Sequence, residues 1–191
     1  MPGFDSFITA LKQRPLIAAV RETHEVIEVC GAPVPVVFFL GGSITTLPEM
    51  VQQVKASGKY AMIHIDLCAG LGRDEAAIEW CAKIAKPDGI ISTRSPLIKY
   101  ASSLGIITIQ RLFLMDSMSF SNGMRIMKST PPDMVEVLPG IVPKAIRALR
   151  DELRLPIIAG GMVTERDEIV AALDAGAVAV STSKKRLWVS S

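Results

Sequence analysis

Two groups of small residues near the end of the chain have the composition of a phosphate-binding site. Gly160-Gly161 follows the apolar run Ile157–Ala159, and Ser181-Thr182-Ser183 follows the apolar run Val178–Val180. Glycine lets backbone N–H groups approach an anion closely, and the N-terminus of a following helix adds a favourable dipole. In a (β/α)8 barrel, the loops after the last two strands commonly hold a phosphate. The sequence therefore predicts that a phosphorylated small molecule is bound by Gly160, Gly161, Ser181, Thr182 and Ser183.

Two carboxylates, Asp66 and Glu136, are expected to face the same ligand. Side chains alternate across a strand, so in the segment 62–66 we expect Met62, His64 and Asp66 to point into the barrel. Glu136 is placed inward by the same alternation. A carboxylate between strand residues is costly to bury unless it is hydrogen-bonded. Both acids therefore serve either the ligand or the protein's own polar groups, and Glu136 with His64 could in principle transfer protons.

Arginines at predicted strand ends suit the same anion. Arg21, Arg94 and Arg111 each lie at such an end, and the guanidinium fork matches the oxygens of a phosphate. Each one alone is equally compatible with a structural salt bridge. The sequence contains no histidine or cysteine cluster with metal-site spacing, no G-x-S-x-G elbow and no Walker A loop. We therefore predict no catalytic residue, no metal and no cofactor.

A third set of residues is basic and is a candidate for contacting RNA. On the predicted helix 142–153 the basic side chains fall within one arc, opposite the apolar ones, and a second basic group follows Ser183. The alternative is a solvated helix face, because only two Trp and two Tyr residues are available for stacking on bases. The candidate RNA-contacting residues are Lys144, Arg147, Arg150, Arg154, Lys184, Lys185 and Arg186.

These residues must be positioned by a regular alternation of strands and helices. Eight apolar runs are expected to be strands: Leu16–Val20, Val36–Leu40, Ala61–Asp66, Gly89–Ser92, Ile106–Leu112, Met134–Val137, Ile157–Ala159 and Val178–Val180. Helical patterns separate most of them: Leu47–Ala56, Glu75–Ala85, Leu97–Ser103, Val142–Leu153 and Glu165–Ala175, the last capped by Thr164 with Asp167 and ended by Gly176. Eight strand–helix units favour a compact (β/α)8 barrel over an open doubly wound sheet.

Composition supports one domain spanning residues 1–191. Hydrophobic residues make up 49% of the chain and aromatic residues only 5%, as expected of an aliphatic core around a parallel sheet. Three cysteines without metal-site spacing indicate free thiols, and no segment resembles a signal peptide or a membrane span. We therefore expect a cytoplasmic protein. The methionine-rich segment 113–132 is expected to form a core-facing helix, or else a lid or a partner surface.

Six segments carry a resemblance that extends from about Arg14 to Trp188. They are HIDLCAGLG (64–72), DGIISTR (88–94), IQRLFLMDS (109–117), PDMVEVLPG (132–140), PIIAGGMV (156–163) and AVAVSTSKKRLW (177–188). In their order and completeness they resemble the glycerol-3-phosphate-responsive antiterminators of Gram-positive bacteria, the glycerol uptake operon antiterminator regulators.

The resemblance implies a barrel without known enzymatic activity that binds sn-glycerol 3-phosphate. Such a protein acts on the leader RNA of glycerol-utilisation genes and allows transcription past a terminator. The phosphate would then sit on Gly160, Gly161, Ser181, Thr182 and Ser183, while Asp66 and Glu136 accept hydrogen bonds from the glycerol hydroxyls and Arg94 and Arg111 assist.

Two other classes of function stay open. An isomerase, epimerase or phosphodiesterase acting on a phosphorylated polyol or sugar is motivated by His64, Asp66 and Glu136. A protein-interaction scaffold is motivated by the methionine-rich segment. The sequence is also compatible with a homodimer, because a short barrel leaves apolar helix surface exposed.

Overall fold

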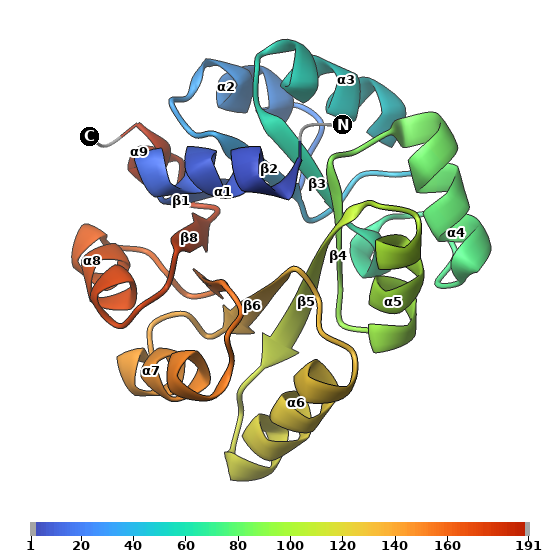
Figure 1. Ribbon diagram of the computed structural model, residues 1–191. Coiled ribbons are helices and arrows are strands. Elements are labelled where there is room, and N and C mark those ends of the chain that lie inside the picture. The colour runs from blue at the N-terminus through green and yellow to red at the C-terminus, as the bar shows by residue number, and fades with distance from the viewer. Residues whose placement is uncertain (1–2, 190–191) are drawn as a thin grey trace.

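The computed structural model describes residues 3–189, in which eight parallel strands close into a barrel (Figure 1). Each strand pairs with its neighbours in the sequence, and β1 pairs with β8 to close the sheet. The strands are β1 (Leu16–Val20), β2 (Val36–Phe39), β3 (Tyr60–His64), β4 (Gly89–Ser92), β5 (Ile107–Phe113), β6 (Met134–Leu138), β7 (Ile157–Gly160) and β8 (Ala179–Thr182). The predicted (β/α)8 barrel is therefore confirmed, with every strand found within two residues of its expected bounds.

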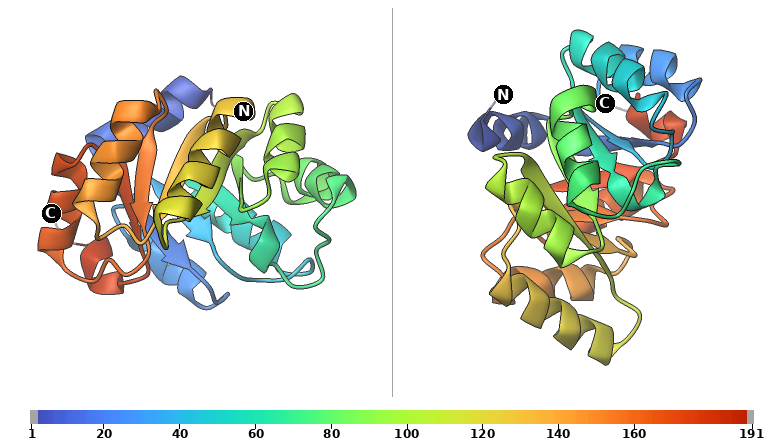
Figure 2. Two further views of the ribbon diagram at one scale, coloured as in Figure 1. Left: turned by 90° about the horizontal axis from the view of Figure 1, so that it is seen from below. Right: turned by 90° about the vertical axis from the view of Figure 1, so that its right-hand side faces the viewer.

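Helices surround this barrel on all sides (Figures 1 and 2). They are α1 (Phe4–Gln13), α2 (Glu25–Gly31), α3 (Leu47–Ala56), α4 (Glu75–Trp80), α5 (Ser95–Ser103), α6 (Ser117–Ser129), α7 (Pro143–Glu152), α8 (Arg166–Asp174) and α9 (Lys185–Trp188). Two short segments add a 3-10 turn, η1 (Ile65–Leu67), and a π-helical extension of α4, η2 (Cys81–Ala85). None of the helices within residues 3–189 is long and apolar enough to cross a membrane.

Side-chain alternation divides the apolar residues of the strands between two layers. Inward residues such as Met62, Ile109 and Ile158 form the barrel interior, and their outward neighbours pack beneath the helices. Helix α1 lies across the end where the strands begin, because Phe7 and Leu11, both 0% exposed, belong to the interior cluster. The sequence analysis did not anticipate α1. Because this helix covers one end of the barrel, a ligand can enter only from the opposite end, where the strands finish.

Local structure departs from the predictions at two places. Strand β3 ends at His64 and Asp66 lies in the 3-10 turn η1, so the expected alternation stops before Asp66. Helix α8 is capped by Glu165 with Glu168 in a capping box, one residue later than the predicted Thr164 and Asp167. The methionine-rich segment does form a core-facing helix, α6, in which Met124 and Met127 are buried.

Candidate functional site

A cavity of about 330 Å³, lined by both polar and apolar side chains, opens at the carboxyl ends of the strands. Its position is the one at which (β/α)8 barrels hold ligands, and its size lies within the usual range for small-molecule sites. Its walls come mainly from β1, β5 and β6 and from the loops after β7 and β8. The lining residues are Ala19, Arg21, Leu40, Leu67, Arg111, Glu136, Leu138, Gly161, Met162, Val163, Ser181, Thr182 and Ser183.

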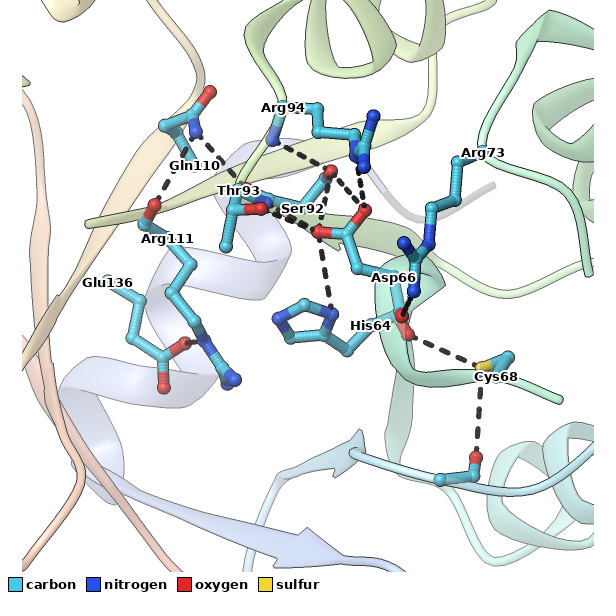
Figure 3. Close-up of polar contacts among 11 residues, drawn as sticks. His64, Asp66, Cys68, Arg73, Ser92, Thr93, Arg94, Gln110, Arg111 and Glu136 are labelled. Carbon is cyan, nitrogen blue, oxygen red and sulfur yellow. Dashed lines mark hydrogen bonds and ion pairs between the residues drawn. The ribbon is translucent and has the colours of Figure 1, made fainter. Parts of the chain in front are cut away.

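A buried ion pair between Arg111 on β5 and Glu136 on β6 lies in this cavity (Figure 3). Arg111 Nε donates to Glu136 Oε2 at 2.6 Å, and Ser181 Oγ donates to Glu136 Oε1 at 2.7 Å. The two side chains are 6% and 1% exposed, so the carboxylate is satisfied by protein partners as a buried charge requires. Within residues 3–189 the two terminal nitrogens of Arg111 make no hydrogen bond. They are therefore available to an anion in the cavity.

Gly160, the last residue of β7, and Gly161, which follows it, are each required to be glycine for a different structural reason. A Cβ atom at Gly160 would lie 2.5 Å from both Glu136 Oε1 and Ser181 Oγ, so this glycine leaves room for the buried hydrogen bond between them. Gly161 has a φ of +74°, and Met162 after it has a φ of 62°, which is uncommon for a residue with a side chain. Gly161 lines the cavity and Gly160 does not. The loop therefore presents only the second glycine to a ligand.

The three hydroxyl groups at the end of β8, those of Ser181, Thr182 and Ser183, are not equivalent. Ser181 Oγ is committed to Glu136, and Thr182 Oγ1 donates to the carbonyl oxygen of Val163 at 2.8 Å, which ties the β8 loop to the β7 loop. Ser183 is exposed and lines the cavity. Among these three, Ser183 has the hydroxyl that is best placed to meet a ligand.

The N-terminus of α8 already holds a carboxylate. Glu168 Oε2 accepts hydrogen bonds from the backbone N–H groups of Thr164 and Glu165, at 2.7 and 2.9 Å. These bonds lower the pKa of Glu168 below its usual value. Because this side chain satisfies the first amides of the helix, the dipole of α8 that we expected to help a phosphate is offset by a charge of the protein itself.

Asp66 and Arg94 lie outside the lining of this cavity. Asp66 accepts hydrogen bonds from Ser92 Oγ and from the backbone N–H and hydroxyl of Thr93, at distances of 2.7–3.1 Å (Figure 3). Arg94 Nε lies 3.7 Å from the same carboxylate. Asp66 therefore fixes the loop after β4. The expectation that Asp66 and Arg94 also contact the ligand stays a prediction.

His64 is buried beside Asp66, and its Nδ1 atom has no hydrogen-bond partner among the described residues. Burial and the nearby Arg111 guanidinium lower the pKa of His64 to about 4, against the opposing effect of Asp66. The imidazole is therefore neutral at pH 7. It does not line the cavity, so the structure does not place it with Glu136 in a shared site for proton transfer.

The edge of the cavity includes two exposed apolar residues that the sequence analysis did not assign to the site. Leu67 on η1 and Met162 after β7 are 49% and 69% exposed, and both line the cavity. Arg21, which was expected to suit an anion, follows β1 and contributes a third exposed side chain. Strand alternation in β6 could have found Leu138, two residues after Glu136, but Leu67 lies in the unpredicted 3-10 turn. Within residues 3–189 no group of three or more His, Cys, Asp or Glu side chains is placed to hold a metal ion.

The candidate RNA-contacting residues divide into two groups. Three are engaged in ion pairs with neighbouring carboxylates: Arg150 with Asp151, Lys185 with Glu25 and Glu28, and Arg186 with Glu165. Within the described part of the chain, the other four side chains form no ion pair: Lys144, Arg147, Arg154 and Lys184. The charge of α7 is thus more available to a partner than the charge that follows Ser183.

Fold and site together define a (β/α)8 barrel with a cavity at the carboxyl ends of its strands. The chain belongs to the glycerol-3-phosphate responsive antiterminator family, whose sequence pattern matches residues 16–188.

The relatives of this chain come from several bacteria. An uncharacterised Escherichia coli K12 protein, YgcP, is 36% identical over 178 residues, which cover 93% of each chain. The crystal structure of a glycerol uptake operon antiterminator regulatory protein from Listeria monocytogenes has a TM-score of 0.89 at 32% identity, covering 92% of this chain and 95% of that one. A related protein from Thermotoga maritima has a TM-score of 0.81 at 33% identity, covering 91% and 96%.

Proposed function

We propose that this protein is a cytoplasmic regulator that binds sn-glycerol 3-phosphate in the cavity and acts on the leader RNA of glycerol-utilisation genes, so that transcription passes a terminator. The observation that carries the ligand assignment is the guanidinium group of Arg111, which is held through Nε by Glu136 and lines the cavity. Membership of the family supports the regulatory role and the RNA.

The cavity suggests how the two ends of the ligand are recognised. The phosphate lies on the loops after β7 and β8, next to Gly161 and Ser183, with Arg21 supplying positive charge from β1. The terminal nitrogens of Arg111 donate to the phosphate, and the glycerol hydroxyls donate to the remaining lone pairs of Glu136. Gly160, Ser181 and Thr182 act by keeping Glu136 and the two loops in place.

In the proposed function the ligand is bound and released unchanged, without a cofactor. Glu136 is held in a buried ion pair with Arg111, and His64 lies outside the cavity with a lowered pKa. Proton transfer between them would need both groups within reach of the same ligand, and only Glu136 lines the cavity. The regulatory reading is therefore better supported than the isomerase, epimerase or phosphodiesterase alternative.

The test is a calorimetric titration with sn-glycerol 3-phosphate, with glycerol and inorganic phosphate as controls. We expect sn-glycerol 3-phosphate to bind more tightly than either control, and the recovered ligand to be chemically unchanged. Absence of binding would remove the ligand assignment, and conversion of the ligand to a product would favour an enzyme. A second titration measures RNA affinity at fixed salt with and without the ligand. A regulator of this kind requires the two affinities to differ.

A further inference from the structure

An open groove of about 620 Å³ runs along α6 and is lined by six residues of that helix, among them Phe120, Met124, Arg125 and Lys128, and by Glu152 at the end of α7. Figures 1 and 2 show α6 and α7 side by side on the outside of the barrel. The lining of the groove shares no residue with the lining of the ligand cavity. Phe120 is half-buried against the apolar cluster beneath the two helices, so its ring is held in a fixed place.

Positive charge gathers around this groove. Arg125 and Lys128 lie on α6, and Lys144, Arg147 and Arg154 lie on or beside the exposed face of α7. The acidic side chain in the groove, Glu152, is 3.4 Å from Lys128 Nζ and is offset by it. Within residues 3–189 the three basic side chains of the α7 face form no ion pair.

The two helices are also the ones that follow the strands carrying the buried ion pair. β5 carries Arg111 and continues into α6, and β6 carries Glu136 and continues into α7. Gly123 of α6 packs directly on Leu112, the residue next to Arg111, since a Cβ atom there would lie 2.5 Å from Leu112 Cδ1. A ligand that changes how Arg111 and Glu136 sit can therefore change the spacing of α6 and α7.

We infer that the α6–α7 groove is the surface that holds RNA, in single-stranded form. This inference rests on the proposed function and assigns its partner to one face of the chain. Single-stranded RNA combines bases that stack on aromatic rings with a backbone that follows positive charge, and this groove offers an aromatic ring flanked by cations. A duplex presents its bases internally, so an aromatic ring in a groove can stack only on an unpaired base.

The experiment compares matched variants of the full chain, using fluorescence anisotropy with a labelled 20-nucleotide single-stranded RNA of mixed sequence. Arg125→Gln/Lys128→Gln removes two charges at the groove. Lys12→Gln/Lys99→Gln removes two exposed charges on α1 and α5 and serves as the control. We expect the groove variant to bind about tenfold more weakly and to lower the slope of log affinity against log salt by about 1.4, because each lost phosphate contact lowers it by about 0.7. The control should match the unaltered protein.

A second variant, Phe120→Leu, keeps an apolar side chain on α6 but removes the aromatic face. We expect about tenfold weaker RNA binding with an unchanged salt slope, because stacking is lost and no charge is removed. Thermal unfolding confirms that each variant is folded before binding is measured.

The outcomes separate this inference from the function on which it rests. If the unaltered protein binds RNA and the groove variants bind equally well, the groove assignment is overturned while the regulatory function stands. If the unaltered protein binds no RNA with or without sn-glycerol 3-phosphate, both fail. Equal binding of a duplex of the same sequence overturns the single-stranded assignment. Loss of a dimer in the groove variants, with RNA affinity unchanged, would assign the groove to a second copy of the chain.

Discussion

Replacing Glu136 by Gln tests the electrostatic balance on which the ligand cavity depends. The variant keeps the size of the side chain and one oxygen acceptor, but it removes the negative charge that faces Arg111 Nε at 2.6 Å. The Arg111 guanidinium is then a buried cation without a counter-ion. The ligand-free protein should lose stability, and an anion in the cavity should restore part of it.

The size of the loss follows from the burial of the pair. Removing one partner of a buried ion pair typically costs about 3–5 kcal/mol. Arg111 lines an open cavity and keeps partial access to water, so we expect about 3 kcal/mol. For a chain of 150–250 residues each kcal/mol lowers the melting temperature by about 2–4 °C, which corresponds to a decrease of about 6–12 °C.

The assay is thermal unfolding with and without saturating inorganic phosphate, followed by calorimetry with phosphate and sn-glycerol 3-phosphate. Phosphate should raise the melting temperature of the Glu136→Gln variant more than that of the unaltered protein, because it replaces the missing counter-ion. The preference for sn-glycerol 3-phosphate over phosphate should fall by about tenfold or more, since hydrogen bonds to a charged acceptor contribute about 1.5–3 kcal/mol.

Together with Arg111→Gln and the double variant Arg111→Gln/Glu136→Gln, the Glu136→Gln variant forms a double-mutant cycle. The single Arg111 variant should be destabilised and should lose phosphate binding. The double variant should recover most of the stability, because a neutral pair leaves no uncompensated charge, and it should also not bind phosphate. The reasoning is refuted if the Glu136 variant is as stable as the unaltered protein, or if the two single effects add in the double variant.

Three further changes test other parts of the structure. Gly161→Ala should destabilise the protein by about 1–3 kcal/mol, because Gly161 has a φ of +74° and the added Cβ would lie 2.9 Å from Leu138 Cδ2. The same variant should bind sn-glycerol 3-phosphate more weakly. Unchanged affinity in calorimetry would show that the phosphate does not bind at Gly161. The pKa of His64 is lowered from its ordinary value of 6.5 to about 4. Between these pH values the unfolded chain therefore binds more protons than the folded protein, so the folded state loses stability as the pH falls. Urea unfolding should show a loss of roughly 3 kcal/mol between pH 6.5 and pH 4. A His64→Asn variant should lack this loss, and an equally steep pH profile in the variant would contradict the assignment. Leu11→Ala should cost about 2–5 kcal/mol in urea unfolding because this side chain is 0% exposed, whereas Leu104→Ala, at a residue 41% exposed, should cost much less.

The barrel was predictable because local sequence and global packing agree along most of the chain. Short aliphatic runs such as Leu16–Val20 and Gly89–Ser92 have the bounds that were predicted, since strands buried on both faces need uninterrupted apolar residues. Helix α1 was missed although Phe4, Phe7, Ile8 and Leu11 have the i, i+3, i+4, i+7 spacing of an amphipathic helix. Its position across the end of the barrel, by contrast, is a long-range contact that has no signature in the local sequence.

The candidate site was predictable where a residue's place follows from its position in a strand. Arg111 and Glu136 line the cavity as alternation predicts, but Asp66 lies in a 3-10 turn that alternation cannot anticipate. The cap of α8 shifted from Thr164 to Glu165 because Glu168 reaches back to two backbone N–H groups. A choice between adjacent capping residues depends on side-chain geometry rather than on residue type alone.

The arrangement of β5 and β6 limits how a ligand in the cavity can influence the surface of the protein. A ligand shifts a conformational equilibrium only by the difference between its affinities for the two states. Among the residues that line the cavity, we expect Arg111 and Glu136 to contribute most to this difference in affinity, because they form a buried ion pair. Any movement of these side chains acts on the two strands that lead into α6 and α7. A ligand such as glycerol, which has no charge to offer Arg111, should therefore fill the cavity without altering the spacing of these helices.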